Sequence, residues 1–138
     1  MEMNAYQRLV ARVKTSAEDG KTLHRHLIGP DWFQTHEQLG EYYGKLDDMS
    51  DHLTEIGLSQ NIADVPIDAA CGAFPLIPIK DRVKAESYEI IADEFLQISE
   101  AMDEVIEEID EGWVISMLNN YQEWLHLEAE FKIDRTLR

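Results

Sequence analysis

Basic residues, cysteine and long apolar runs are all scarce in this sequence of 138 residues. Lysine and arginine number 12 against 28 acidic residues, for a formal charge of −16, so the surface repels phosphate backbones and anionic lipid and attracts cations. The single cysteine, Cys71, cannot form an internal disulfide, which is typical of the reducing cytosol. No run approaches the roughly 18 apolar residues of a membrane helix, and no signal peptide is visible at the N-terminus. We therefore expect a cytoplasmic protein that associates with neither membrane nor nucleic acid.

Apolar residues nevertheless make up 44% of the chain, enough for a packed core, and the length predicts a single domain over residues 1–138. These residues recur every three or four positions, the spacing of amphipathic helices, and no useful stretch alternates with period two. Four helices are predicted, and their apolar positions run from Tyr6 to Leu27, Leu39 to Ile56, Ile91 to Ile109 and Val114 to Phe131. The predicted fold class is an all-α four-helix bundle.

Glycine and proline suggest where these helices end. Gly29-Pro30 is expected to end the first helix, and Gly57 the second. Asp31 is expected to cap the second helix, with Gln34 completing a capping-box pattern. Gly20 offers an alternative break inside the first helix.

Connection lengths then predict the topology. The turns near residues 29–31 and 110–112 are short, so the helices on either side of each turn should be antiparallel neighbours. Residues 58–80 contain prolines that exclude a long helix. Extended, they can span a helix of about 39 Å, which makes the second and third helices parallel, as in ferritin-like bundles with one long crossover. The alternative is a segment with a short helix that folds across one end.

Candidate metal ligands are concentrated around the first turn and along the second helix. His24 and His36 lie on opposite sides of the turn and come level in an antiparallel hairpin. Asp51 and Glu55 are spaced i, i+4 and therefore share a helix face. Imidazole and carboxylate together suit iron, zinc or manganese. The alternative interpretation is structural: such histidines commonly cap helices, and such carboxylates commonly face solvent.

Distance decides how these ligands could cooperate. His36 and Asp51 are fifteen positions apart on one predicted helix, or roughly 22 Å, far beyond the reach of one ion. Each chain would therefore carry two half-sites. Two chains related by a two-fold axis could bring the histidines of one against the carboxylates of the other, which creates two sites per dimer.

The segment His24–His36 resembles the helix–turn–helix signature of Dps proteins, the ferritin-like mini-ferritins. That family has a histidine, a glycine five residues later, an aromatic residue after it, and a second histidine twelve residues after the first. An aspartate and a glutamate follow, fifteen and nineteen residues beyond the second histidine. Asp51 and Glu55 occupy those two positions in this sequence.

The resemblance implies a hollow dodecamer that oxidises Fe(II), usually with hydrogen peroxide, stores the ferric product inside, and so protects against oxidative damage. It also implies that His24 and His36 bind iron from one subunit and that Asp51 and Glu55 bind it from the two-fold partner.

Two departures from the family concern the iron site. Gly40 stands where the family places a further aspartate, and Glu41 is about 100° around the helix from that position. We therefore expect one tight Fe(II) per site and a looser second ion. Arg25 replaces the family's tryptophan, and Trp32 nearby is expected to serve packing rather than act as a radical sink.

A third departure concerns DNA, which family members commonly bind through a lysine-rich tail. Residues 1–8 hold one arginine and one glutamate, and the last seven residues are only mildly basic. Twelve copies would carry a formal charge of about −192, which opposes such weak tails. We therefore expect no appreciable DNA binding.

Two other functions remain open from the sequence. One is a ferritin-like di-metal site inside each bundle, with Glu18, Glu89, Glu123 and His126 as its candidate ligands. The other is a helical assembly protein without functional metal, in which the histidines are caps and the acidic residues only keep the surface hydrated.

Overall fold

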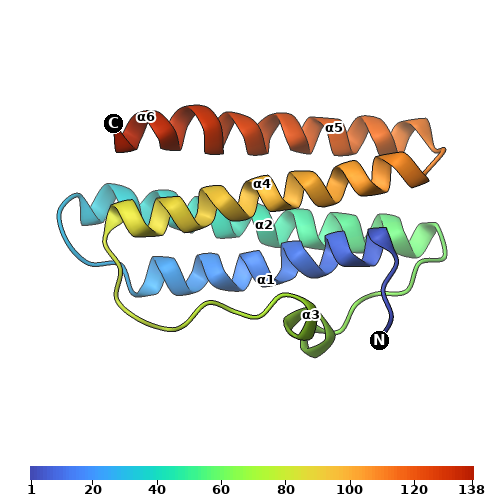
Figure 1. Ribbon diagram of the computed structural model, residues 1–138, viewed down its shortest axis with the longest axis horizontal. Coiled ribbons are helices and arrows are strands. Elements are labelled where there is room, and N and C mark those ends of the chain that lie inside the picture. Colours follow the sequence, from blue (N-terminus) through green and yellow to red (C-terminus); the bar gives the residue numbers. More distant parts are fainter.

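Four long helices lie side by side in the structure, a computed structural model that describes residues 1–138 (Figure 1). They are α1 (Ala5–Arg25), α2 (Trp32–Ser59), α4 (Lys84–Glu108) and α5 (Gly112–His126), the last continuing through a π-helical segment η1 (Leu127–Ile133) into α6 (Asp134–Leu137). Helices α1 and α2 are antiparallel, as are α4 and α5 (Figure 1). The predicted all-α four-helix class is confirmed, and the fourth helix extends beyond its predicted end.

The connection between α2 and α4 runs along the bundle beside α1, so that α2 and α4 are parallel (Figure 1). This confirms the ferritin-like long crossover. The connection also carries a short helix, α3 (Ile67–Ala73), which packs on α1 rather than folding across one end. Two hydrogen bonds fix its last residues to the α1–α2 turn: Arg82 N–H donates to His26 O at 3.2 Å, and Ile28 N–H donates to Arg82 O at 3.0 Å.

The core consists of the apolar residues whose spacing predicts the helices. All four long helices contribute side chains that are almost completely buried, among them Leu9, Leu46, Phe95 and Leu118. Burying each such side chain contributes about 1.5–3 kcal/mol, so the hydrophobic stripes determine how the helices pack. No helix of the structure is both long and apolar enough to cross a membrane.

Gly57, expected to end the second helix, and Gly20, an alternative break in the first, both lie inside helices. Helix α1 passes through Gly20 and ends at Arg25, and α2 passes through Gly57. A Cβ on Gly20 would lie 2.9 Å from Tyr43 Cβ, and one on Gly57 would lie 2.8 Å from Tyr6 Cε1. The helix end predicted at Gly57 is wrong, and the alternative break at Gly20 does not occur, because each glycine permits close packing of a neighbouring helix rather than a turn.

The capping box predicted at Asp31 is also wrong. Asp31 adopts a left-handed backbone conformation (φ 62°), and its side chain makes no capping hydrogen bond. A capping side chain needs extended backbone to reach the first turn of its helix. The Asp31 carboxylate pairs instead with Lys84 at 2.9 Å, which ties the start of α2 to the start of α4.

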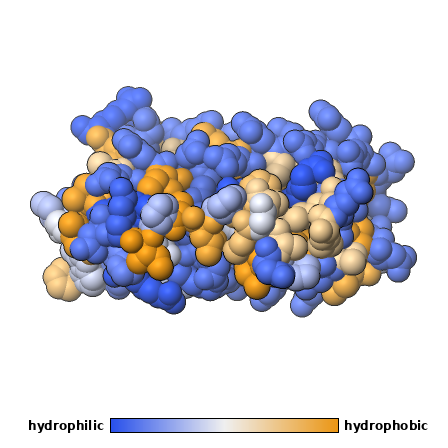
Figure 2. Space-filling view, turned by 60° about the horizontal axis from the view of Figure 1, so that its bottom comes forward, coloured by the Kyte–Doolittle hydropathy of each residue, from blue (hydrophilic) through white to orange (hydrophobic).

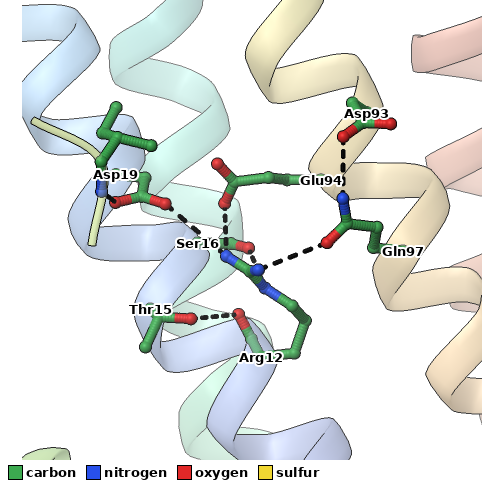
Figure 3. A network of polar contacts seen from close by, with 8 residues as sticks. Arg12, Thr15, Ser16, Asp19, Asp93, Glu94 and Gln97 are labelled. Atoms are coloured by element: carbon green, nitrogen blue, oxygen red, sulfur yellow. Dashed lines mark hydrogen bonds and ion pairs between the residues drawn. The ribbon is translucent and has the colours of Figure 1, made fainter. Parts of the chain in front are cut away.

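A buried ionic cluster joins α1, α4 and the crossover. The Arg12 guanidinium lies between two carboxylates, 2.8 Å from Glu94 Oε1 and 3.6 Å from Asp19 Oδ2 (Figure 3). The other oxygen of Asp19 accepts a hydrogen bond from Ile77 N–H at 3.0 Å, which anchors the crossover. Burial, followed by the neighbouring Asp19, raises the pKa of Glu94 to about 8. Glu94 therefore carries a proton at neutral pH.

Candidate metal centre

The two histidines of the predicted site meet where α1 ends and α2 begins. Their rings stack with centroids 3.7 Å apart and planes 20° from parallel. His24 Nδ1 lies 2.7 Å from His36 O, and His36 Nδ1 lies 3.0 Å from His24 O. The expectation that both imidazoles come level across the turn is confirmed, and the reciprocal hydrogen bonds go beyond what the spacing predicts.

Two further aromatic side chains hold this pair. Trp32 stacks on His36 at 4.2 Å, and its indole N–H donates to Leu27 O at 2.8 Å. Tyr43 meets His24 edge-on at 5.3 Å. Because Trp32 and His36 are spaced i, i+4 on one helix, the sequence carries a signal for their contact. The indole therefore packs against a candidate ligand and fixes the orientation of its ring.

The hydrogen bonds also determine which ring nitrogens can bind a metal. A carbonyl oxygen only accepts, so each Nδ1 must carry the hydrogen, and in the neutral ring the lone pair then lies on Nε2. No hydrogen bond within the chain engages either Nε2. Burial lowers the pKa of His24, which favours its neutral form. Imidazoles oriented through Nδ1 in this way are typical of metal ligands.

The two candidate carboxylates lie farther along α2. Asp51 and Glu55 are both exposed, and neither forms an ion pair or a hydrogen bond within the chain. Helix α2 is unbroken between His36 and Asp51, so the separation of roughly 22 Å expected from the sequence holds.

A single chain does not complete a metal centre. The structure brings no group of three histidine, cysteine, aspartate or glutamate side chains together for an ion. One chain therefore offers a pair of imidazoles at one place and a pair of carboxylates at another.

The ligands considered for a site inside each bundle are not brought together either. Glu18 forms an ion pair with Lys21 at 3.0 Å, and Glu89 and Glu123 are exposed. His126 is exposed as well, and its Nε2 lies 2.8 Å from Ser99 Oγ. The helix faces that carry these residues do not converge inside the bundle.

Position 40 contacts the imidazole pair directly. A Cβ built on Gly40 would lie 3.1 Å from His24 Cε1 and 3.3 Å from His24 Nδ1. Glu41, considered as a substitute ligand, is exposed and lies 3.4 Å from the amide of Gln38. The sequence marks Gly40 only as a missing carboxylate, and the structure adds that the position has little room for a side chain.

Comparisons with known proteins identify the fold. No protein-family model and no curated protein matches the chain. Among solved structures, antigen TpF1 from Treponema pallidum superposes with a TM-score of 0.89 at 16% identity, covering 97% of this chain and 89% of that one. A Dps protein from Bacillus brevis gives 0.87 at 19% identity, with coverage of 97% and 93%. A Vibrio cholerae Dps, described as a member of a superfamily of ferritin-like diiron-carboxylate proteins, gives 0.72 at 17%, with coverage of 98% and 87%.

The chain therefore has the ferritin-like fold of Dps proteins. The resemblance inferred from residues 24–55 is confirmed at the level of the fold over nearly the whole chain.

Proposed function

We propose that this chain is the subunit of a Dps-like iron-storage assembly that oxidises Fe(II) between two-fold-related copies. His24 and His36 of one copy and Asp51 and Glu55 of its partner would form each site. The observation that carries the proposal is the imidazole pair: two rings held by reciprocal backbone hydrogen bonds, with both Nε2 atoms left for a ligand that their own chain does not supply.

A second copy supplies the missing ligands without any change in the fold. When two α2 helices pack antiparallel about a two-fold axis, the first turns of one lie beside the later turns of the other. The contact is isologous, so each dimer gains two equivalent sites. Helix α2 suits this arrangement because it is unbroken over the 28 residues from Trp32 to Ser59.

The surface offers apolar area for such a contact. Figure 2 turns the crossover side of the molecule forward and shows apolar residues gathered in patches among hydrophilic ones. Exposed apolar side chains occur on the α1–α2 turn, at both ends of α2 and along the crossover, namely Ile28, Phe33, Leu58, Ile67, Leu76, Ile79 and Val83. Phe33 is 83% exposed and Ile79 is 74% exposed. Exposed apolar patches of this kind are common at protein interfaces, and we assign them to contacts with further copies of this chain.

The donor set suits iron as the substrate. Neutral imidazole nitrogens and carboxylate oxygens both bind Fe(II), and the negative carboxylates favour the more highly charged Fe(III) product. With hydrogen peroxide as the oxidant, two Fe(II) ions each lose one electron. The peroxide takes both electrons and two protons and becomes two waters. Such a site acts as a ferroxidase and removes both Fe(II) and hydrogen peroxide, the two reagents of radical chemistry.

The charge of the chain supports iron uptake and storage. A formal charge of −16 per subunit attracts cations toward the assembly, and in a closed dodecamer acidic residues on the inner surface would bind the ferric product. Of the two alternatives, the site inside each bundle has the weaker support because its candidate ligands do not converge.

Peroxide-driven Fe(II) oxidation, measured together with assembly mass, tests the proposal. We expect His24→Ala/His36→Ala and, separately, Asp51→Asn/Glu55→Gln to reduce the initial rate by about 100-fold or more, because each removes half of the ligands. The carboxylate variant lies on an exposed face and should keep its fold. His126→Ala serves as the matched control and should retain the wild-type rate.

Four outcomes would contradict the proposal. A monomeric protein would remove the second half of every site. Full oxidation by the histidine variant would place the chemistry elsewhere, and loss of oxidation in His126→Ala would favour a site inside the bundle. An assembled wild-type protein that oxidises no Fe(II) would be a helical assembly protein without functional metal.

A further inference from the structure

Helices α1 and α2 pack closely beside the imidazole pair, where Gly20 permits the approach of the α2 backbone and Gly40 leaves room for the His24 ring. On α1, a Cβ at Gly20 would lie 2.9 Å from Tyr43 Cβ of α2. On α2, a Cβ at Gly40 would lie 3.1 Å from His24 Cε1 of α1. The two contacts are linked, because Tyr43 also meets the His24 ring edge-on at 5.3 Å.

The His24 ring has little freedom to move away from position 40. Its Nδ1 is hydrogen-bonded to His36 O at 2.7 Å, and its ring stacks on His36 at 3.7 Å. His36 is in turn stacked on Trp32 at 4.2 Å. A displacement of a few tenths of an ångström would therefore strain the hydrogen bond, the stack or both.

We propose that Gly40 is a positioning residue whose missing side chain allows His24 and His36 to form their reciprocal hydrogen bonds. A side chain at position 40, including a carboxylate, displaces His24. The significance for iron rests on the function proposed above. In this chain, a carboxylate added at position 40 displaces an imidazole ligand. The substitution therefore does not increase the number of metal ligands at the site.

Gly44 provides a matched control one turn farther along α2. A Cβ on Gly44 would meet no atom within 4 Å. Replacing glycine by alanine inside a helix stabilises it at either position through helix propensity, so only the contact with His24 distinguishes Gly40→Ala from Gly44→Ala. Gly57→Ala provides a control for general damage, because it meets Tyr6 toward the opposite end of α2.

The first readout needs no metal. Crystal structures of the metal-free variants give the distance from His24 Nδ1 to His36 O directly, whatever the size of the assembly. We expect this hydrogen bond to be lengthened or lost in Gly40→Ala and Gly40→Asp and to be unchanged in Gly44→Ala, Gly44→Asp and Gly57→Ala. In thermal unfolding, Gly44→Ala should have a higher Tm than the wild type. Gly40→Ala should show no such increase in Tm.

The second readout is anaerobic Fe(II) titration of the same variants. We expect Gly40→Ala and Gly40→Asp to weaken the tight site by about tenfold, as disturbing the support of a metal ligand commonly does. The Gly44 variants should bind Fe(II) like the wild type. Gly57→Ala should bind it normally even if its Tm falls.

The two readouts separate this inference from the proposed function. Gly40→Ala with an intact histidine pair would overturn the inference, and so would Gly40→Asp that keeps the pair and gains a second tight ion. A wild-type protein that binds no Fe(II) would overturn the proposed function, while the metal-free structures would still decide the role of Gly40.

Discussion

His24 and His36 are joined through each other's backbone carbonyls, at 2.7 and 3.0 Å, across a turn that the crossover also holds. The candidate ligands are therefore part of the structure that fixes the end of the hairpin. Their geometry is set before any ion arrives, because the same hydrogen bonds that hold α1 to α2 orient both rings. Because the two histidines are preorganised, binding of a metal ion requires little rearrangement of their side chains.

The absence of a carboxylate at Gly40 predicts how many ions each site holds. Two imidazoles and two carboxylates are enough to ligate one Fe(II) well, and they leave few donors for a second. Anaerobic titration should give one tight Fe(II) per subunit, since a dimer has two sites, and a second ion that binds more weakly. Two equally tight ions per subunit would contradict this prediction.

The buried Glu94 predicts a dependence of stability on pH. The folded chain keeps a proton there up to about pH 8, whereas the unfolded chain releases it near the ordinary pKa of 4.5. Unfolding therefore releases a proton between these values, and stability falls as pH rises through this window and levels off above it.

Urea unfolding at a fixed protein concentration between pH 5 and pH 9 measures this effect. We expect Glu94→Gln, which cannot ionise, to lose much of this decrease in stability and to be more stable than the wild type by on the order of 4 kcal/mol at pH 8. Glu100→Gln, an exposed change on the same helix, should follow the wild-type profile. An unchanged profile in Glu94→Gln would contradict the raised pKa.

Periodicity and connection lengths predicted most of the fold because the apolar spacing of each helix faces the core. The end predicted at Gly57 and the alternative break at Gly20 are absent from the structure, because a glycine that permits close packing looks the same in the sequence as one that ends a helix. The level pairing of His24 and His36 followed from an antiparallel hairpin. Their reciprocal hydrogen bonds could not be predicted because they depend on the separation of α1 and α2, which the contacts at Gly20 and Gly40 set in three dimensions.

Charge predicts the behaviour of the protein toward DNA. The formal charge of −16 per chain, multiplied in an assembly, repels a phosphate backbone, and the mildly basic C-terminal residues are too few to overcome it. A gel-shift experiment at physiological salt should show no retarded DNA. Because divalent ions can bridge two anions, the experiment is run with chelator, and a clear shift under that condition would contradict the prediction.

Complementation between two inactive variants tests most directly whether each site is shared between copies. Chains carrying His24→Ala/His36→Ala keep their carboxylates, and chains carrying Asp51→Asn/Glu55→Gln keep their imidazoles. A heterodimer of the two has one intact and one empty site. Equal amounts assembled at random should therefore recover about a quarter of the wild-type Fe(II) oxidation rate, although neither variant is active alone. Recovery near that level would support ligation across the two-fold axis, and mixed assemblies as inactive as either parent would contradict it.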